Sequence, residues 1–98
     1  MTEAEYLGQV YDICKDAGAK AHHCGDGRAC CGAGFPDLVI MGVHGILYRE
    51  VKASPNDRKS PEQTAVLWLL KASGADAAVW TSEDLLTGKV AEEIRRIA

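Results

Sequence analysis

The feature that most constrains the fold is a hairpin pattern between residues 37 and 53. The run DLVIM, apolar after its first residue, is followed by the turn sequence GVHG and then by the alternating stretch ILYREVKA. Glycines on both sides of two residues are typical of a tight turn between antiparallel strands. If Val43 and His44 form the loop, the numbers of facing residues sum to 87, which places Asp37 opposite Glu50.

Two carboxylates directly opposed across a strand pair repel each other and cost stability. A divalent cation between Asp37 and Glu50 would remove this cost, because hard oxygen ligands suit Mg²⁺ and Mn²⁺. Lys52 lies on the Glu50 face of its strand, within reach of a bound anion or an attacking water. This combination predicts metal-assisted hydrolysis of a phosphodiester. The competing interpretation is structural: Asp37 caps its strand, and Glu50 and Lys52 form a solvated ion pair.

The remaining segments alternate between helical and extended patterns. Thr2 with Glu5, and Ser60 with Gln63, have the spacing of capping boxes at helix starts. The predicted order is a helix over 3–17, a loop over 24–34, strands over 37–41 and 46–53, a helix from Ser60 to Gly74, a strand over 77–80 and a helix from Ser82 onward. This order is that of a layered α/β domain.

The composition agrees with one globular domain over residues 1–98. Hydrophobic residues make up 47% and charged residues 26%, and no apolar run approaches the ~20 residues of a membrane helix. The first residues, MTEAEYLGQV, lack the pattern of a secretory signal, so we expect a cytoplasmic protein. The formal net charge of −3 argues against non-specific binding of nucleic acids. However, residues 20–72 carry seven basic and five acidic residues, so a basic surface is expected to be local.

Three of the four cysteines crowd into the segment AHHCGDGRACCGAG. This segment offers five soft ligands for a structural zinc ion: His22, His23, Cys24, Cys30 and Cys31. The C-x-x-C spacing of common zinc sites is absent from it. The alternative is a glycine-rich loop whose reduced thiols are partly buried.

The string GAGFPDLVI, followed by REVKASPNDRKSPEQ and AVLWLLKASGADAAVW, resembles the VRR-NUC family, the virus-type replication and repair nucleases of the PD-(D/E)XK superfamily. The resemblance covers residues 3–85. Its motifs occur in family order: P-D at the first strand, E-x-K at the second, S-P-x-Q at the helix start and G-A before the next strand. It implies a restriction-endonuclease-like core with the order α-β-β-α-β-α and a central mixed sheet flanked by helices.

The resemblance also implies roles for individual residues. Asp37, Glu50 and the main-chain carbonyl of Val51 would bind Mg²⁺ or Mn²⁺, and Lys52 would be the catalytic lysine. Gln63 matches a family glutamine that faces the active site, although its local pattern also fits a capping-box partner.

The family places an acidic residue of the first helix near the metal. Glu5 is the residue expected in this position, with Glu3 in reserve. The alternative for both is a role in capping or in stabilising the helix dipole, which requires no catalysis.

The expected partner is DNA, recognised by its structure and not by its sequence, because no segment predicts the reading of base edges. Arg58 and Lys59, in the loop beside the site, are the best candidates for phosphate contacts. His22 and Arg28 match basic positions of the family's first loop. An ordinary solvated loop is the alternative for these residues.

Stand-alone members of the family act as dimers, so the resemblance implies a homodimer that acts on branched DNA such as four-way (Holliday) junctions. Trp68, Leu69 and Trp80 belong either to such an interface or to the core. The small stand-alone form suggests a phage-encoded repair or replication protein in the cytoplasm of a bacterial host. The alternative function is a nuclease fold that binds DNA without cutting it, with or without a zinc-stabilised loop.

Overall fold

The structure, a computed structural model, describes residues 1–23, 34–54 and 60–98. None of the helices in these ranges has the length and apolar character needed to cross a membrane. In chain order the elements are α1 (Glu3–Ala17), β1 (Lys20–His23), β2 (Leu38–Gly42), β3 (Gly45–Lys52), α3 (Pro61–Ala72), β4 (Asp76–Thr81), α4 (Ser82–Leu86) and α5 (Lys89–Ile97).

The strands form one mixed sheet in the order β1-β2-β3-β4. The pairs β1–β2 and β2–β3 are antiparallel, whereas β3 and β4 are parallel and are joined by a crossover through α3. In the β2–β3 hairpin Gly42 faces Gly45, so the two residues between them form the turn. The predicted register is confirmed. It places Asp37, the residue before β2, opposite Glu50.

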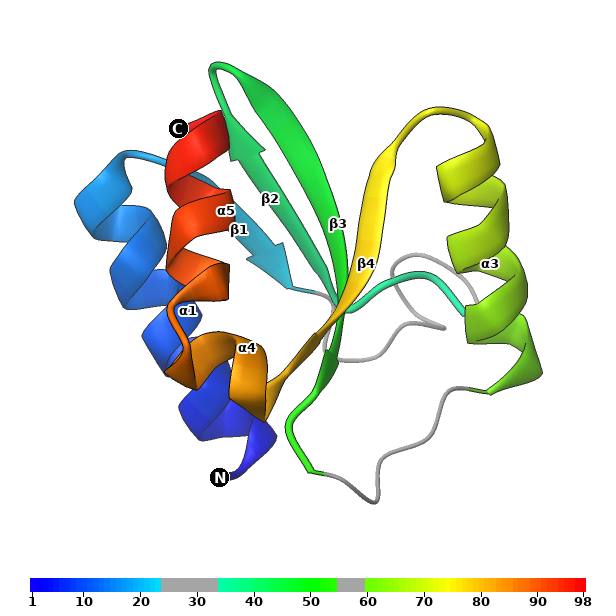
Figure 1. The fold of residues 1–98 in the computed structure, drawn as a ribbon, viewed down its shortest axis with the longest axis horizontal. Helices are drawn as coiled ribbons and strands as arrows, with labels where there is room; N and C mark the ends of the chain where they lie inside the picture. Colours follow the sequence, from blue (N-terminus) through cyan, green and yellow to red (C-terminus); the bar gives the residue numbers. More distant parts are fainter. Residues whose placement is uncertain (24–33, 55–59) are drawn as a thin grey trace.

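The helices lie on both faces of this sheet. Figure 1 shows α1, α4 and α5 together on one side and α3 on the other. The hydrophobic core lies between the sheet and the first group of helices, and its fully buried side chains include Tyr6, Val10, Leu38, Ile40, Leu47, Trp80, Val90 and Ile94. Because side chains alternate along β3, Val51 points into this core while Glu50 and Lys52 point toward the side of α3.

One charged side chain enters the core. Arg49 is 1% exposed and donates hydrogen bonds to Glu93 Oε1 and Asp76 Oδ1, each at 2.8 Å. Its guanidinium lies 5.4 Å from the ring centroid of Trp80, whose Nε1 also donates to Glu93 Oε1 at 2.9 Å. A buried charge is tolerated when it is paired and hydrogen-bonded in this way. The network ties β3 to β4 and α5.

Two parts of the fold differ from the sequence prediction. The strand β1 is absent from the predicted order, because four residues of alternating exposure are too few for a periodic signal. The last helix is interrupted: α4 ends at Leu86, and Gly88, with φ of 87°, precedes α5. Glycine adopts this left-handed conformation without the strain that other residues incur. The N-cap of α4 is Thr81.

The two tryptophans have different environments. Trp80 is fully buried in the core, whereas Trp68 on α3 is 67% exposed and its neighbour Leu69 is 60% exposed. The core therefore uses only one of the two rings.

Candidate active site

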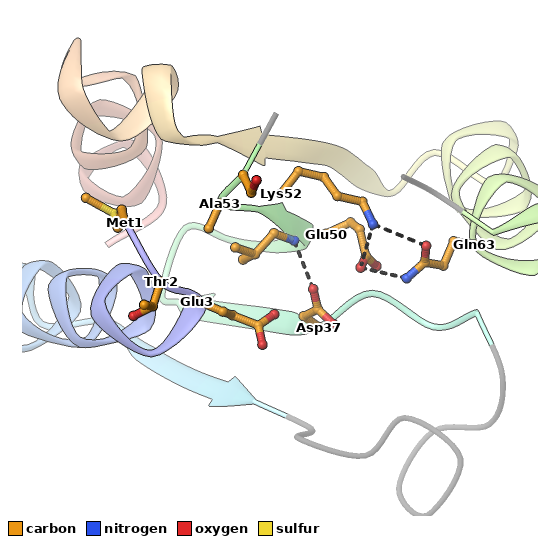
Figure 2. Close-up of a pocket in the computed structure, with 10 residues that line it drawn as sticks. Met1, Thr2, Glu3, Asp37, Glu50, Lys52, Ala53 and Gln63 are labelled. Atoms are coloured by element: carbon orange, nitrogen blue, oxygen red, sulfur yellow. Dashed lines mark hydrogen bonds and ion pairs between the residues drawn. The ribbon is translucent and has the colours of Figure 1, made fainter. Parts of the chain in front are cut away.

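A pocket of about 400 Å³ opens where β3 ends, between the first turns of α1 and α3 (Figure 2). The capping boxes at Thr2 and Ser60 start these two helices, and the hairpin register sets the strand end between them. The walls of the pocket are formed by Met1, Thr2, Glu3, Asp37, Glu50, Val51, Lys52, Ala53, Ser54 and Gln63. The pocket therefore brings together every predicted catalytic side chain except that of Glu5.

The two opposed carboxylates are held differently. Asp37 accepts a hydrogen bond from the main-chain N–H of Val51 at 3.0 Å, which fixes its carboxylate against β3. Glu50 is only 2% exposed, and its Oε1 accepts a hydrogen bond from Gln63 Nε2 at 2.8 Å. Its Oε2 is buried and has no hydrogen-bond partner among the described residues. Such an oxygen is costly to bury, which indicates a site adapted to a positively charged ligand.

The surroundings of Glu50 also raise the pKa of its carboxyl. Burial and the negative charges of the neighbouring Asp37 and Glu3 raise the pKa of Glu50 from 4.5 to about 8, while the Lys52 ammonium opposes this shift. The neutral form of Glu50 is therefore favoured more strongly here than in a free glutamate. Strongly shifted pKa values of this kind are typical of functional sites.

Lys52 lies beside the carboxylate pair. Its Nζ is 3.4 Å from Gln63 Oε1 and 3.9 Å from Glu50 Oε1, and its side chain is 15% exposed. Figure 2 shows the ammonium pointing between these two side chains at the rim of the pocket. An ammonium carries three hydrogen-bond donors, so a bound anion can be contacted from this position.

These donors fit a hard divalent cation. Carboxylate oxygens are the ligands that Mg²⁺ and Mn²⁺ prefer, and Glu50 Oε2 is buried without a partner in the described part of the chain. Within residues 1–23, 34–54 and 60–98, no three His, Cys, Asp or Glu side chains are arranged to hold an ion together. Asp37 and Glu50 would therefore be the two side chains that bind the ion. Mg²⁺ is commonly bound by one or two carboxylates together with waters and substrate phosphates.

The acid that α1 contributes to the pocket is Glu3 and not Glu5. Glu5 is exposed, and its Oε1 accepts a hydrogen bond from the main-chain N–H of Thr2 at 3.0 Å, which lowers the pKa of this carboxyl. Glu3 lines the pocket, and its charge contributes to the raised pKa of Glu50. The preference for Glu5 is thus corrected, because its exposed side chain turns back to Thr2 and does not line the pocket.

Sequence reasoning also missed the wall that Met1 and Thr2 form. Both residues line the pocket next to Glu3. The signal for them was their place directly before Glu3, the residue of α1 that lines the pocket.

The remaining predicted contacts are described only in part. His22 and His23 lie on β1, where consecutive side chains point to opposite faces of the sheet, so a single ion bound by both is disfavoured. Cys24, Arg28, Cys30, Cys31, Arg58 and Lys59 lie outside the described residues. The zinc site and the phosphate contacts of these loops stay predictions.

No protein-family model matches the sequence, and no curated protein matches it. A solved structure described as a "VRR_NUC domain protein" is similar, with a TM-score of 0.71 and 23% sequence identity; the match covers 100% of this chain and 91% of that one. The chain has the fold of a VRR_NUC domain protein. The resemblance expected from the sequence is confirmed at the level of the fold, as is the α/β core with a mixed sheet between helices.

Proposed function

We propose that the chain is a Mg²⁺- or Mn²⁺-dependent endonuclease that hydrolyses phosphodiester bonds in DNA. The observation that carries this proposal is the set formed by Asp37, Glu50 and Lys52. Two opposed carboxylates, one with a buried oxygen unpartnered among the described residues, lie beside an ammonium group. The likeness to a VRR_NUC domain protein supports a nuclease fold and hence DNA as the class of substrate.

Each of these residues would have a separate role in the hydrolysis. Asp37 and Glu50, with the main-chain carbonyl of Val51, would hold the cation, which supplies charge neutralisation and an acidified water when bound. The hydrogen bond from Val51 N–H fixes Asp37 before substrate arrives, so this carboxylate needs no reorganisation during the reaction. Lys52 would donate to the phosphate oxygen whose negative charge grows in the transition state.

The finer identity of the substrate is part of the proposal. We expect branched DNA, four-way junctions included, bound by a homodimer whose two sites address symmetry-related strands. Arg58, Lys59, Arg28 and His22 are the proposed phosphate contacts, and a cytoplasmic location follows from this role. His22 is exposed on β1, as such a contact requires.

The test is a cleavage assay on labelled junction, flap and linear DNA in Mg²⁺ and in Mn²⁺. Asp37→Asn and Lys52→Ala should each lower the rate by about 100-fold or more, because each removes charge at the reacting phosphate. Asp12→Asn and Lys71→Ala change the same residue types at exposed positions and should leave the rate unchanged.

The same assay decides against the proposal if the wild type cuts none of these substrates in either metal. DNA binding that persists without cleavage would then establish the alternative, a nuclease fold that serves as a binding module. Cleavage that is unchanged in both Asp37→Asn and Lys52→Ala would place the chemistry elsewhere.

A further inference from the structure

The amide of Gln63 has its orientation dictated by its neighbours. Its Oε1 accepts from the main-chain N–H of Ser60 at 2.9 Å and lies 3.4 Å from Lys52 Nζ. Both of these groups are donors only, so the oxygen of the amide must face them. Its Nε2 then faces Glu50 and donates to Oε1 at 2.8 Å. The usual ambiguity between the two ends of a glutamine amide is absent at this position.

This orientation selects which oxygen of Glu50 is available. Gln63 occupies Oε1, and Lys52 lies on the same side, 3.9 Å from that oxygen. The other oxygen, Oε2, is buried and without a hydrogen-bond partner in the described chain. Both Glu50 and Gln63 line the pocket (Figure 2). The amide therefore holds the carboxylate by one oxygen and leaves the second for a ligand.

The capping box at the start of α3 holds the side chain of Gln63 in place. Ser60 Oγ accepts from Gln63 N–H at 3.1 Å, while Ser60 N–H donates to the Gln63 side chain. The first bond belongs to the helix cap alone. The second fixes the amide that contacts Glu50. Pro61 at the first helical position, which has no N–H, stiffens this turn of α3.

We propose that Gln63 is a positioning residue for the metal site, whose side chain, oriented by the N-cap of α3, presents Glu50 Oε2 to the cation. This inference rests on the proposed function, since it requires that Glu50 binds a divalent ion. Groups that hydrogen-bond to metal ligands orient those ligands, and their loss typically weakens metal affinity by about 10- to 100-fold. The sequence alone allows a purely structural capping role for the same residue.

The experiment measures binding of Mn²⁺ alone to the full chain, from the electron paramagnetic resonance signal of the free ion. Gln63→Met removes the amide at similar side-chain length, and its dissociation constant should rise by about 10- to 100-fold. Ser60→Ala is the matched control, because it removes the helix cap but keeps the main-chain N–H that orients Gln63. Its dissociation constant should stay within about twofold of the wild type, although its melting temperature should fall.

A side-chain NMR measurement on the wild type covers the case in which Gln63→Met does not fold. The Nε2 protons of Gln63 should shift when Mg²⁺ is added, because their acceptor, Glu50, becomes a ligand. Resonances that do not move would overturn the proposal.

The outcomes separate this inference from the proposed function. Equal Mn²⁺ affinity of Gln63→Met and the wild type, or an equal loss in Gln63→Met and Ser60→Ala, would overturn the positioning role and leave the nuclease proposal standing. A wild type that binds no Mn²⁺ would overturn both.

Discussion

The carboxyl of Glu50 has a pKa of about 8 in the folded, metal-free chain, compared with 4.5 for a free glutamate. Between these two pH values the folded state binds more protons than the unfolded state, so the free energy of unfolding falls as the pH rises through this window. Above about pH 8 the loss is complete. Glu50→Gln removes the ionisation. In EDTA we therefore expect this variant to be more stable than the wild type at pH 8, with the difference shrinking toward pH 5.

Urea unfolding of both proteins across this pH range measures the effect. Glu92→Gln, a change at an exposed position of α5, should follow the pH dependence of the wild type. Parallel stability curves for Glu50→Gln and the wild type would show that the Glu50 carboxyl is ionised in the folded state throughout.

Much of the site was predictable at the level of single residues. The hairpin register alone placed Asp37 opposite Glu50, and the alternation along β3 put Lys52 on the same face. Of the two acids considered in α1, Glu3 lines the pocket, whereas Glu5 has the capping role that was its alternative. The capping box alone does not decide this assignment, because Gln63 belongs to such a box in α3 and still contacts Glu50 in the pocket.

The elements differ in how strongly the sequence specifies them. Capping boxes defined the starts of α1 and α3, and two glycines around a two-residue turn defined the β2–β3 hairpin. The strand β1 has four residues, and its pairing with β2 is a tertiary contact that local patterns do not encode. The break at Gly88 could not be predicted from the hydrophobic pattern, because the apolar residues of α5 have helical spacing whether or not a separate helix precedes them.

The network around Arg49 joins β3, on which Glu50 stands, to β4 and α5. Arg49→Met should destabilise the fold by about 3–5 kcal/mol, because it leaves the carboxylate of Glu93, 13% exposed, without its buried partner. Arg96→Met is the control, since Arg96 pairs with Asp76 at the surface and its side chain is 58% exposed. Exposed pairs contribute only about 0–1 kcal/mol. Urea unfolding measures both, and equal losses in the two variants would contradict the buried role of Arg49.

At the scale of the whole molecule, the net charge of −3 is compatible with a DNA partner because of where the acids lie. Glu3, Asp37 and Glu50 line one pocket, and a divalent cation bound there would offset part of their charge. Three of the 14 acidic residues thus lie where the proposed chemistry needs them. Without the cation the pocket would repel a phosphate, so metal and DNA are expected to bind together.

The outer side of α3 provides the test of the proposed homodimer. Trp68 is 67% and Leu69 is 60% exposed, so α3 presents two neighbouring large apolar side chains, and tryptophan is enriched at interfaces between proteins. If the dimer forms through α3, sedimentation of the wild type should give twice the chain mass of 10.5 kDa, and Trp68→Glu with Leu69→Glu should give the monomer. Leu86→Glu, at a 79% exposed position of α4, is the matched control and should leave the dimer intact. A wild type that sediments as a monomer at all concentrations would refute the homodimer, whereas a dimer that survives the α3 substitutions would place the interface on another face.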